Sequence, residues 1–127
     1  MSIAHKVLRP LALTTVALAA MVMAAQAQAP EDLRVALVIG NAAYSGAPLA
    51  NPANDARAMG DTLRGLGFVV IEVRDASRQQ MLAAVQRAGE SLKGKRGVGM
   101  LFYAGHGLQL DWRNYMVPVD ANLTAST

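Results

Sequence analysis

His106 is the side chain in this sequence best suited to acid–base chemistry. It lies between Gly105 and Gly107, directly after the apolar run Val98–Tyr103. An imidazole changes its charge near neutral pH, so it can act as a general base. The residue Gly107 leaves a free backbone amide beside the ring, which suits a developing oxyanion. The pattern therefore favours a base and a hydrogen-bond donor in one loop, with a purely structural histidine as the alternative.

Other common functional sites lack their residues. The sequence contains no cysteine and only two histidines, so it cannot form a disulfide or a thiolate metal site. It also has no glycine-rich dinucleotide fingerprint and no Walker lysine motif. Nucleotide, metal and phosphoacceptor chemistry are therefore disfavoured, and we expect no cofactor and no metal.

The first 27 residues have the pattern of a secretory signal. Lys6 and Arg9 precede an apolar stretch that ends at Ala25, and Ala27 completes a small-x-small cleavage pattern. The uncharged stretch of about 15 residues is shorter than the roughly 20 needed to cross a bilayer, which disfavours an uncleaved membrane anchor. We therefore expect a signal peptide over 1–27, a mature domain over 28–127, and a periplasmic or secreted location.

The charge balance excludes some classes of partner. The 127-residue chain has 12 basic and 9 acidic side chains, a formal net charge of +3. Removing Lys6 and Arg9 leaves 10 basic against 9 acidic residues, or +1. Charges of both signs are scattered, so we expect neither a nucleic acid nor, after signal cleavage, a membrane as a partner.

Strand and helix patterns alternate through the mature chain, which predicts a parallel sheet with right-handed crossovers and flanking helices. If the second strand lies on one side of the first and the third on the other, the strand order is flavodoxin-like. A short hairpin, with strands over 108–110 and 115–117, follows. The expected main elements are a strand over Arg34–Ile39, a helix with Asn51 as N-cap and Pro52 at its first position, a strand over Phe68–Val73, a helix with a capping box of Ser77 and Gln80, and a strand over Val98–Tyr103.

Parallel sheets bind ligands at the carboxyl ends of their strands. The first and third strands would be neighbours in this order. The first strand ends at Gly40 and Asn41, and the third leads into the loop that carries His106. We therefore expect a site built from these two loops.

Four sequence blocks occur in a characteristic order. They are Arg34–Tyr44, Leu49–Ala56 with the tail Leu63–Phe68, Phe102–Gly107, and Asn114–Asp120. Together they resemble the caspase-like peptidases, specifically the bacterial metacaspase-like branch, over essentially all of the mature chain. The resemblance implies a caspase-like α/β fold and a cysteine endopeptidase that acts on peptide or protein substrates.

The resemblance also implies roles for individual residues. His106 matches the catalytic histidine that assists a cysteine thiol, and Gly107 matches the residue whose amide contributes to the oxyanion hole. Asp55 matches an acidic residue that lines the pocket for a substrate arginine or lysine; its alternative role is to stabilise the first turn of its helix. Asn41 and Tyr44 would flank the cleft, with Tyr44 either packing or contacting substrate.

The cysteine that this chemistry needs is missing. In caspases it follows the histidine by about 50 residues, which places it near position 156, beyond Thr127. A base and an amide donor without a thiolate cannot perform covalent catalysis. We therefore expect a caspase-like domain that is incomplete at its C-terminus, lacks the remaining part of its own domain and is inactive as it stands. The alternative is a non-catalytic interaction module, in which Trp112 of the hairpin could contact a partner.

Overall fold

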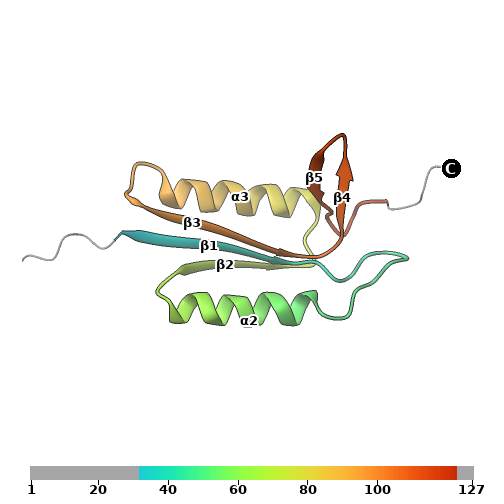
Figure 1. Ribbon diagram of the computed structural model, residues 1–127, viewed down its shortest axis with the longest axis horizontal. Helices are drawn as coiled ribbons and strands as arrows, with labels where there is room; N and C mark the ends of the chain where they lie inside the picture. Colours follow the sequence, from blue (N-terminus) through green and yellow to red (C-terminus); the bar gives the residue numbers. More distant parts are fainter. Residues whose placement is uncertain (1–31, 123–127) are drawn as a thin grey trace, which may run out of the picture. The chain divides into compact units, whose positions relative to one another are not determined.

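The computed structural model describes residues 32–122, so the predicted signal peptide lies outside the described part of the chain. The described residues form a parallel sheet, two helices and a hairpin (Figure 1). In chain order the elements are β1 (Leu33–Gly40), α2 (Pro52–Gly65), β2 (Val69–Arg74), α3 (Arg78–Leu92), β3 (Gly97–Ala104), β4 (Gly107–Leu110) and β5 (Arg113–Met116).

The sheet has the strand order β2-β1-β3, and both pairs of neighbours are parallel. This confirms the expected order, with β1 in the centre. Strands β1 and β3 are one residue longer at each end than expected, because backbone pairing continues past the last apolar side chain, and β2 is shifted by one residue towards the C-terminus. At the carboxyl edge, Gly40 pairs with Arg74 on one side and with Ala104 on the other.

The helices cover opposite faces of the sheet (Figure 1). Side chains alternate between the two faces along a strand. Ala36 and Val38 of β1 therefore pack in one apolar cluster with α2, while Leu37 and Ile39 pack in another with α3. Burial on both faces explains why β1 reads as a continuous apolar run.

Helices α2 and α3 both begin where the sequence predicts, but only α3 has a side-chain cap. The side chain of Ser77 accepts a hydrogen bond from the backbone of Gln80, and the side chain of Gln80 accepts one from the backbone of Ser77, which is a capping box. Pro52 occupies the first turn of α2, but the Asn51 side chain caps nothing. Asn51 is the N-cap residue, as the sequence predicts, but its side chain forms no capping hydrogen bond because its backbone angles are helical, φ −106° and ψ −18°, and a side-chain cap requires extended ones.

The hairpin is tighter than expected. Strands β4 and β5 pair Leu110 with Arg113, so only Asp111 and Trp112 form the turn. Both have positive φ, 49° and 63°, which defines the type I′ turn that suits the twist of a hairpin. The expected loop over 111–114 was too long because pairing extends further than the apolar residues. Trp112 at the tip is 95% exposed.

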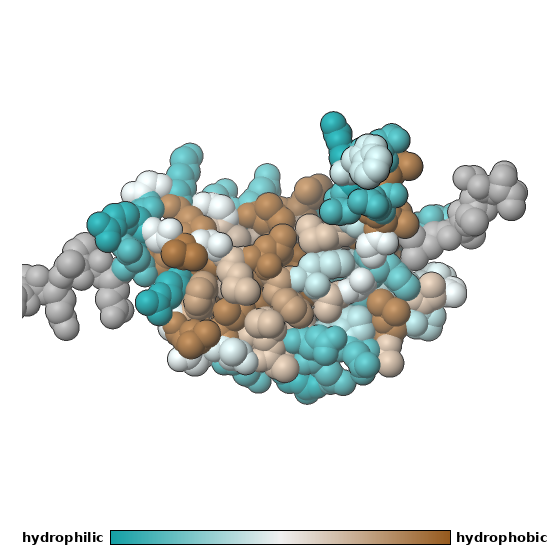
Figure 2. All heavy atoms as spheres, viewed as in Figure 1, coloured by the Kyte–Doolittle hydropathy of each residue, from teal (hydrophilic) through white to brown (hydrophobic). Residues whose placement is uncertain are grey.

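Large apolar side chains remain exposed on β3, on α3 and on the hairpin. Val98, Met100 and Leu101 of β3 are 40% to 54% exposed, and β3 is an edge strand of the described sheet. Figure 2 shows apolar side chains gathered across the middle of the face that Figure 1 presents. Within residues 32–122, neither helix is long and apolar enough to cross a membrane.

An ion-pair cluster joins α2 to β2. The carboxylate of Glu72 accepts hydrogen bonds from Arg64 at 2.8 Å and from Arg74 at 2.9 Å. Partial burial acts to raise the pKa of Glu72, but the hydrogen bonds and charges of the two arginines outweigh it and hold this pKa below its ordinary value of 4.5.

The depressed pKa of Glu72 predicts a pH-dependent contribution to stability. This contribution is fully present above the unfolded pKa and disappears as the pH falls through the lower, folded one. We expect Glu72→Gln to reduce the free energy of unfolding at pH 7 by about 0.5 to 1 kcal/mol. Urea unfolding at a series of pH values should show this difference vanish in acid, and a difference that is constant with pH would contradict the assignment.

Candidate functional site

The loops that follow β1 and β3 lie side by side at the carboxyl edge of the sheet. The Asn41 amide donates to the Ala104 carbonyl at 2.8 Å, so pairing continues one residue beyond the two strands. The first of these loops leads to α2, and the second carries His106 into β4. The structure thus brings together the two loops from which the sequence predicts a site.

The loop between β1 and α2 orients the His106 ring. Nε2 of His106 lies 2.7 Å from the carbonyl oxygen of Ala47. A carbonyl only accepts hydrogen bonds, so the proton of the neutral ring sits on Nε2. The other nitrogen, Nδ1, then has the lone pair that can accept a proton. The ring of Tyr44 lies against the imidazole, with 4.5 Å between their centres and 59° between their planes.

The amide of Gly107 points away from the hairpin. His106 lies opposite Val117, whose amide donates to the His106 carbonyl at 3.0 Å. Opposed residues of an antiparallel pair alternate between hydrogen-bonded and non-hydrogen-bonded positions. The next pair, Gly107 and Met116, is therefore of the second kind. The Gly107 N–H is therefore directed away from β5. Its role as an oxyanion donor remains a prediction.

Two tyrosine hydroxyls lie at the base of the hairpin. Tyr103 Oη is 2.7 Å from the His106 carbonyl and 3.1 Å from the Val117 amide. Tyr44 Oη is 2.9 Å from the Val117 carbonyl and 3.0 Å from the His106 amide. Tyr103 Oη also lies 2.9 Å from the Val117 carbonyl. An assignment in which each hydroxyl donates to a carbonyl and accepts from an amide is consistent with these distances. We call Tyr44 and Tyr103 the tyrosine clamp.

Sequence reasoning missed this role of Tyr103, because only the fold brings it opposite Tyr44. The two hydroxyl oxygens are 3.0 Å apart. Burial, and then the hydrogen bond to Tyr44, raise the pKa of Tyr103. The hydroxyl therefore keeps its proton and remains a hydrogen-bond donor.

Gly105 is the residue that makes room for the tyrosine clamp. A Cβ atom at this position would lie 2.5 Å from Tyr103 Oη and 2.6 Å from Tyr44 Oη. At Gly107 the nearest such atom is 3.7 Å away. The two glycines beside His106 thus differ, since a side chain at 105 would collide with the two hydroxyls, whereas one at 107 would meet no close atom.

Asn41 is not a substrate-facing residue in this structure, contrary to the sequence-based prediction. Its side chain is fully buried. Its Oδ1 accepts from the Ala76 amide at 2.9 Å, and its Nδ2 donates to the Val117 carbonyl at 3.2 Å. A cleft residue needs a free polar atom, whereas this amide is fully used to join β1, the start of α3 and the segment after β5.

Asp55 lies in the first turn of α2 with an exposed side chain. Helix α2 begins at the same edge of the sheet, since a Cβ on Gly40 would lie 2.5 Å from the Pro52 carbonyl oxygen. The Asp55 carboxylate forms no salt bridge with another residue of 32–122. Its position is compatible with both expected roles, pocket lining and stabilisation of the helix start.

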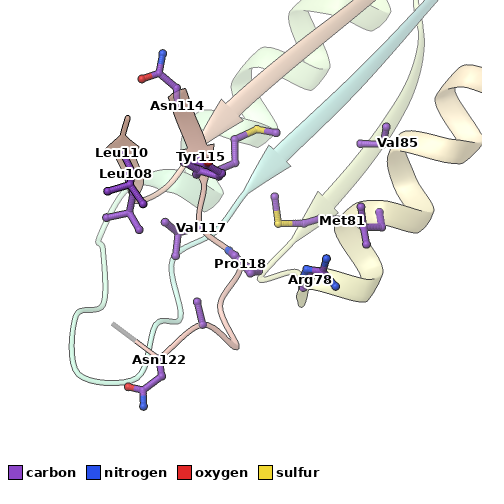
Figure 3. A pocket seen from close by; sticks show the side chains of 13 residues that line it. Arg78, Met81, Val85, Leu108, Leu110, Asn114, Tyr115, Val117, Pro118 and Asn122 are labelled. Atoms are coloured by element: carbon purple, nitrogen blue, oxygen red, sulfur yellow. The ribbon is translucent and has the colours of Figure 1, made fainter. Parts of the chain in front are cut away.

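One pocket adjoins the loop after β1, and a second lies between α3 and the hairpin. One, of about 510 Å³, is lined by Ser45–Ala47 and by 119–122, and so lies beside the carbonyl that binds His106. The other is an apolar groove of about 630 Å³ between α3 and the hairpin, with Met81, Val85 and Leu108 in its wall (Figure 3). No group of three or more His, Cys, Asp or Glu side chains within the described range could hold a metal ion.

Comparisons with known proteins agree with this architecture. The family model described as a caspase domain matches residues 33–127. The mucosa-associated lymphoid tissue lymphoma translocation protein 1 homolog of Mus musculus is 39% identical over 89 residues, which cover 69% of this chain and 11% of that protein. The Homo sapiens mucosa-associated lymphoid tissue lymphoma translocation protein 1 matches with the same identity and coverage. The chain thus spans a small part of the length of these relatives.

Proposed function

Because the chain belongs to the caspase-domain family, we propose that it supplies the histidine side of a cysteine endopeptidase site that acts on peptide or protein substrates. The observation that carries this proposal is the state of the His106 ring. Its Nε2 is held by the Ala47 carbonyl, which leaves Nδ1 as the base. The Gly107 amide lies on the same loop and is directed out of the hairpin.

The proposed chemistry follows from these two groups. A cysteine thiol gives its proton to Nδ1 of His106, and the thiolate attacks the scissile carbonyl carbon. The carbonyl oxygen becomes an oxyanion, which the Gly107 N–H stabilises. The imidazolium then returns the proton to the leaving amine, and water hydrolyses the thioester. This sequence contains no cysteine, so we expect no cleavage by the chain as it stands.

We further propose that Asp55 favours substrates with arginine or lysine at the cleavage point. This proposal rests on an exposed carboxylate, without a salt bridge to the described residues, at the edge of the sheet that carries His106. An exposed ion pair contributes about 0.2 to 1 kcal/mol, so Asp55 would tune the preference rather than create binding by itself.

The test is a binding titration, since binding needs no nucleophile. We expect an arginine peptide to shift the NMR resonances of His106 and Gly107 in the 127-residue chain. Its neutral citrulline analogue should bind more weakly. Asp55→Asn should reduce the affinity for the arginine peptide about two- to fivefold and leave that for the citrulline peptide unchanged.

Asp61→Asn is the matched control, because Asp61 is also exposed on α2 but pairs with Arg64. It should leave both affinities unchanged. If neither peptide shifts the resonances of His106 and Gly107, the proposed substrate site is wrong. An equal loss of affinity in Asp55→Asn and Asp61→Asn would leave Asp55 as a residue that stabilises its helix.

A non-catalytic interaction module is the second candidate function. Two observations favour it: the sequence contains no cysteine, and the groove between α3 and the hairpin has mostly apolar walls. In this case peptides should bind the groove and shift resonances of Val85 and Leu108, with those of His106 unaffected. The same titration therefore separates the two functions.

The branch of the family and the location of the protein stay predictions. The bacterial metacaspase-like branch rests on the four sequence blocks, while the two similar curated proteins are mammalian. The signal peptide over residues 1–27 and the periplasmic or secreted location rest on the N-terminal sequence pattern alone.

A further inference from the structure

We propose that Tyr44 is a positioning residue for His106, fixing both the backbone and the ring of the histidine so that Nδ1 is presented as the base. The use of Nδ1 as a base rests on the proposed function. The positioning of His106 by Tyr44 rests on the geometry of their contacts alone.

Tyr44 contacts His106 in two independent ways. Its hydroxyl accepts the backbone N–H of His106 at 3.0 Å, and its ring lies against the imidazole with 4.5 Å between centres. Tyr44 is only 3% exposed, and its hydroxyl also lies 2.9 Å from the Val117 carbonyl. A ring held at both its face and its hydroxyl is a rigid support, because tyrosine has few rotatable bonds.

The Tyr44 contact replaces a hydrogen bond that the hairpin would otherwise form. At a hydrogen-bonded position of an antiparallel pair, the two opposed residues exchange two N–H to carbonyl bonds. Val117 donates to the His106 carbonyl in this way, but the His106 N–H turns to Tyr44 Oη instead. The histidine backbone is thereby tied to the loop after β1. That same loop supplies the Ala47 carbonyl that binds Nε2, so the backbone and the ring of His106 are both hydrogen-bonded to one segment.

Tyr103 should have a smaller effect than Tyr44 on the position of His106. Its hydroxyl lies near the His106 carbonyl and the Val117 amide, but these two groups also bond directly to each other at 3.0 Å. Loss of the Tyr103 hydroxyl therefore leaves both groups paired. Loss of the Tyr44 hydroxyl leaves the His106 N–H without its partner. The structure thus assigns the larger positioning effect to Tyr44.

The test measures the His106 ring directly in the ¹⁵N-labelled 127-residue chain. Long-range ¹H–¹⁵N spectra report which ring nitrogen carries the proton, and a His106→Gln variant separates this ring from that of His5. In the unaltered chain we expect the proton on Nε2 and slow exchange of that proton with water. In Tyr44→Phe we expect the two ring nitrogens to become more alike and the Nε2 proton to exchange about tenfold faster, the scale set by one lost hydrogen bond.

Three variants separate positioning from general stability. Tyr115→Phe removes an exposed hydroxyl on β5, and Val35→Ala removes buried contacts on β1, at the end of the sheet away from His106. Neither should change the His106 ring resonances, although Val35→Ala lowers the unfolding midpoint. Tyr103→Phe should change them less than Tyr44→Phe does.

Two results would overturn the proposal. One is a His106 ring spectrum in Tyr44→Phe that equals the spectrum of the unaltered chain, or that changes no more than it does in Tyr103→Phe. The other needs no variant at all: rapid exchange of the Nε2 proton in the unaltered chain would show that the ring is not held. These measurements use no peptide, so positioning can fail while the arginine-peptide titration succeeds, and the reverse.

Discussion

Replacing Asn41 by alanine should lower the free energy of unfolding by about 2 to 4 kcal/mol, because it leaves the buried Ala76 amide without an acceptor and opens a small cavity. Asn41 is fully buried, and its oxygen is the acceptor for the buried Ala76 amide at 2.9 Å. Its nitrogen lies within 3.5 Å of the carbonyls of Ala76 and Val117. Alanine removes all of these bonds at once.

Urea or thermal unfolding measures this effect. For a domain of this size the loss corresponds to a fall in the melting temperature of about 10 to 25 °C. Asn114→Ala is the matched control, because Asn114 is exposed on β5, and its change should stay within about 0.5 kcal/mol. Asn41→Leu fills the space without hydrogen bonds. If Asn41→Leu is as stable as the unaltered chain, the hydrogen bonds of Asn41 do not stabilise the fold.

Replacing Gly105 by alanine should cost about 1 to 3 kcal/mol, the usual penalty for adding a methyl group to a filled site. The new Cβ would lie 2.5 Å and 2.6 Å from the hydroxyl oxygens of Tyr103 and Tyr44. The tyrosine clamp must move apart, and the His106 backbone moves with it. We therefore expect a loss of stability together with a change in the His106 ring spectrum.

Gly107→Ala is the control on the other side of His106, where the nearest atom is 3.7 Å from the added Cβ. It should be close to neutral for stability. The double variant Tyr103→Phe with Gly105→Ala removes the closest contact, although the ring carbon Cζ of residue 103 still lies 2.8 Å from the added Cβ. Its cost should therefore be less than the sum of the two single costs. Additive costs, or equal costs for Gly105→Ala and Gly107→Ala, would contradict the clash.

These two experiments address the parts of the site that hold His106 rather than the chemistry itself. Asn41 joins the end of β1 to the start of α3 and to Val117. Val117 in turn lies opposite His106, with the tyrosine clamp between the two segments. Removing the Asn41 hydrogen bonds or displacing the tyrosine clamp should therefore increase the mobility of the same loop, the one that carries His106.

The order of the elements could be predicted because local patterns determine it. Continuous apolar runs indicated parallel strands, and the Ser77 capping box marked the start of α3. The burial expected from these runs holds for β1, whereas Val98, Met100 and Leu101 of β3 are 40% to 54% exposed. The position of the N-cap at Asn51 was predicted correctly, but its missing side-chain hydrogen bond and the short hairpin turn were not foreseen. Both depend on backbone angles, and the side chains of Asn51 and Trp112 do not reveal those angles in advance.

The sequence by itself determined the fold class, the strand order and the position of His106 at the carboxyl edge, because alternating strand and helix patterns allow few topologies. Only the tertiary structure decided what surrounds that histidine. The ring of His106 is hydrogen-bonded to Ala47, 59 residues away, and its backbone N–H to Tyr44, 62 residues away. Hydrogen bonds between segments so distant leave no periodic trace in a sequence. For this reason Asn41 was predicted in the cleft but lies in the core, and the role of Tyr103 was missed.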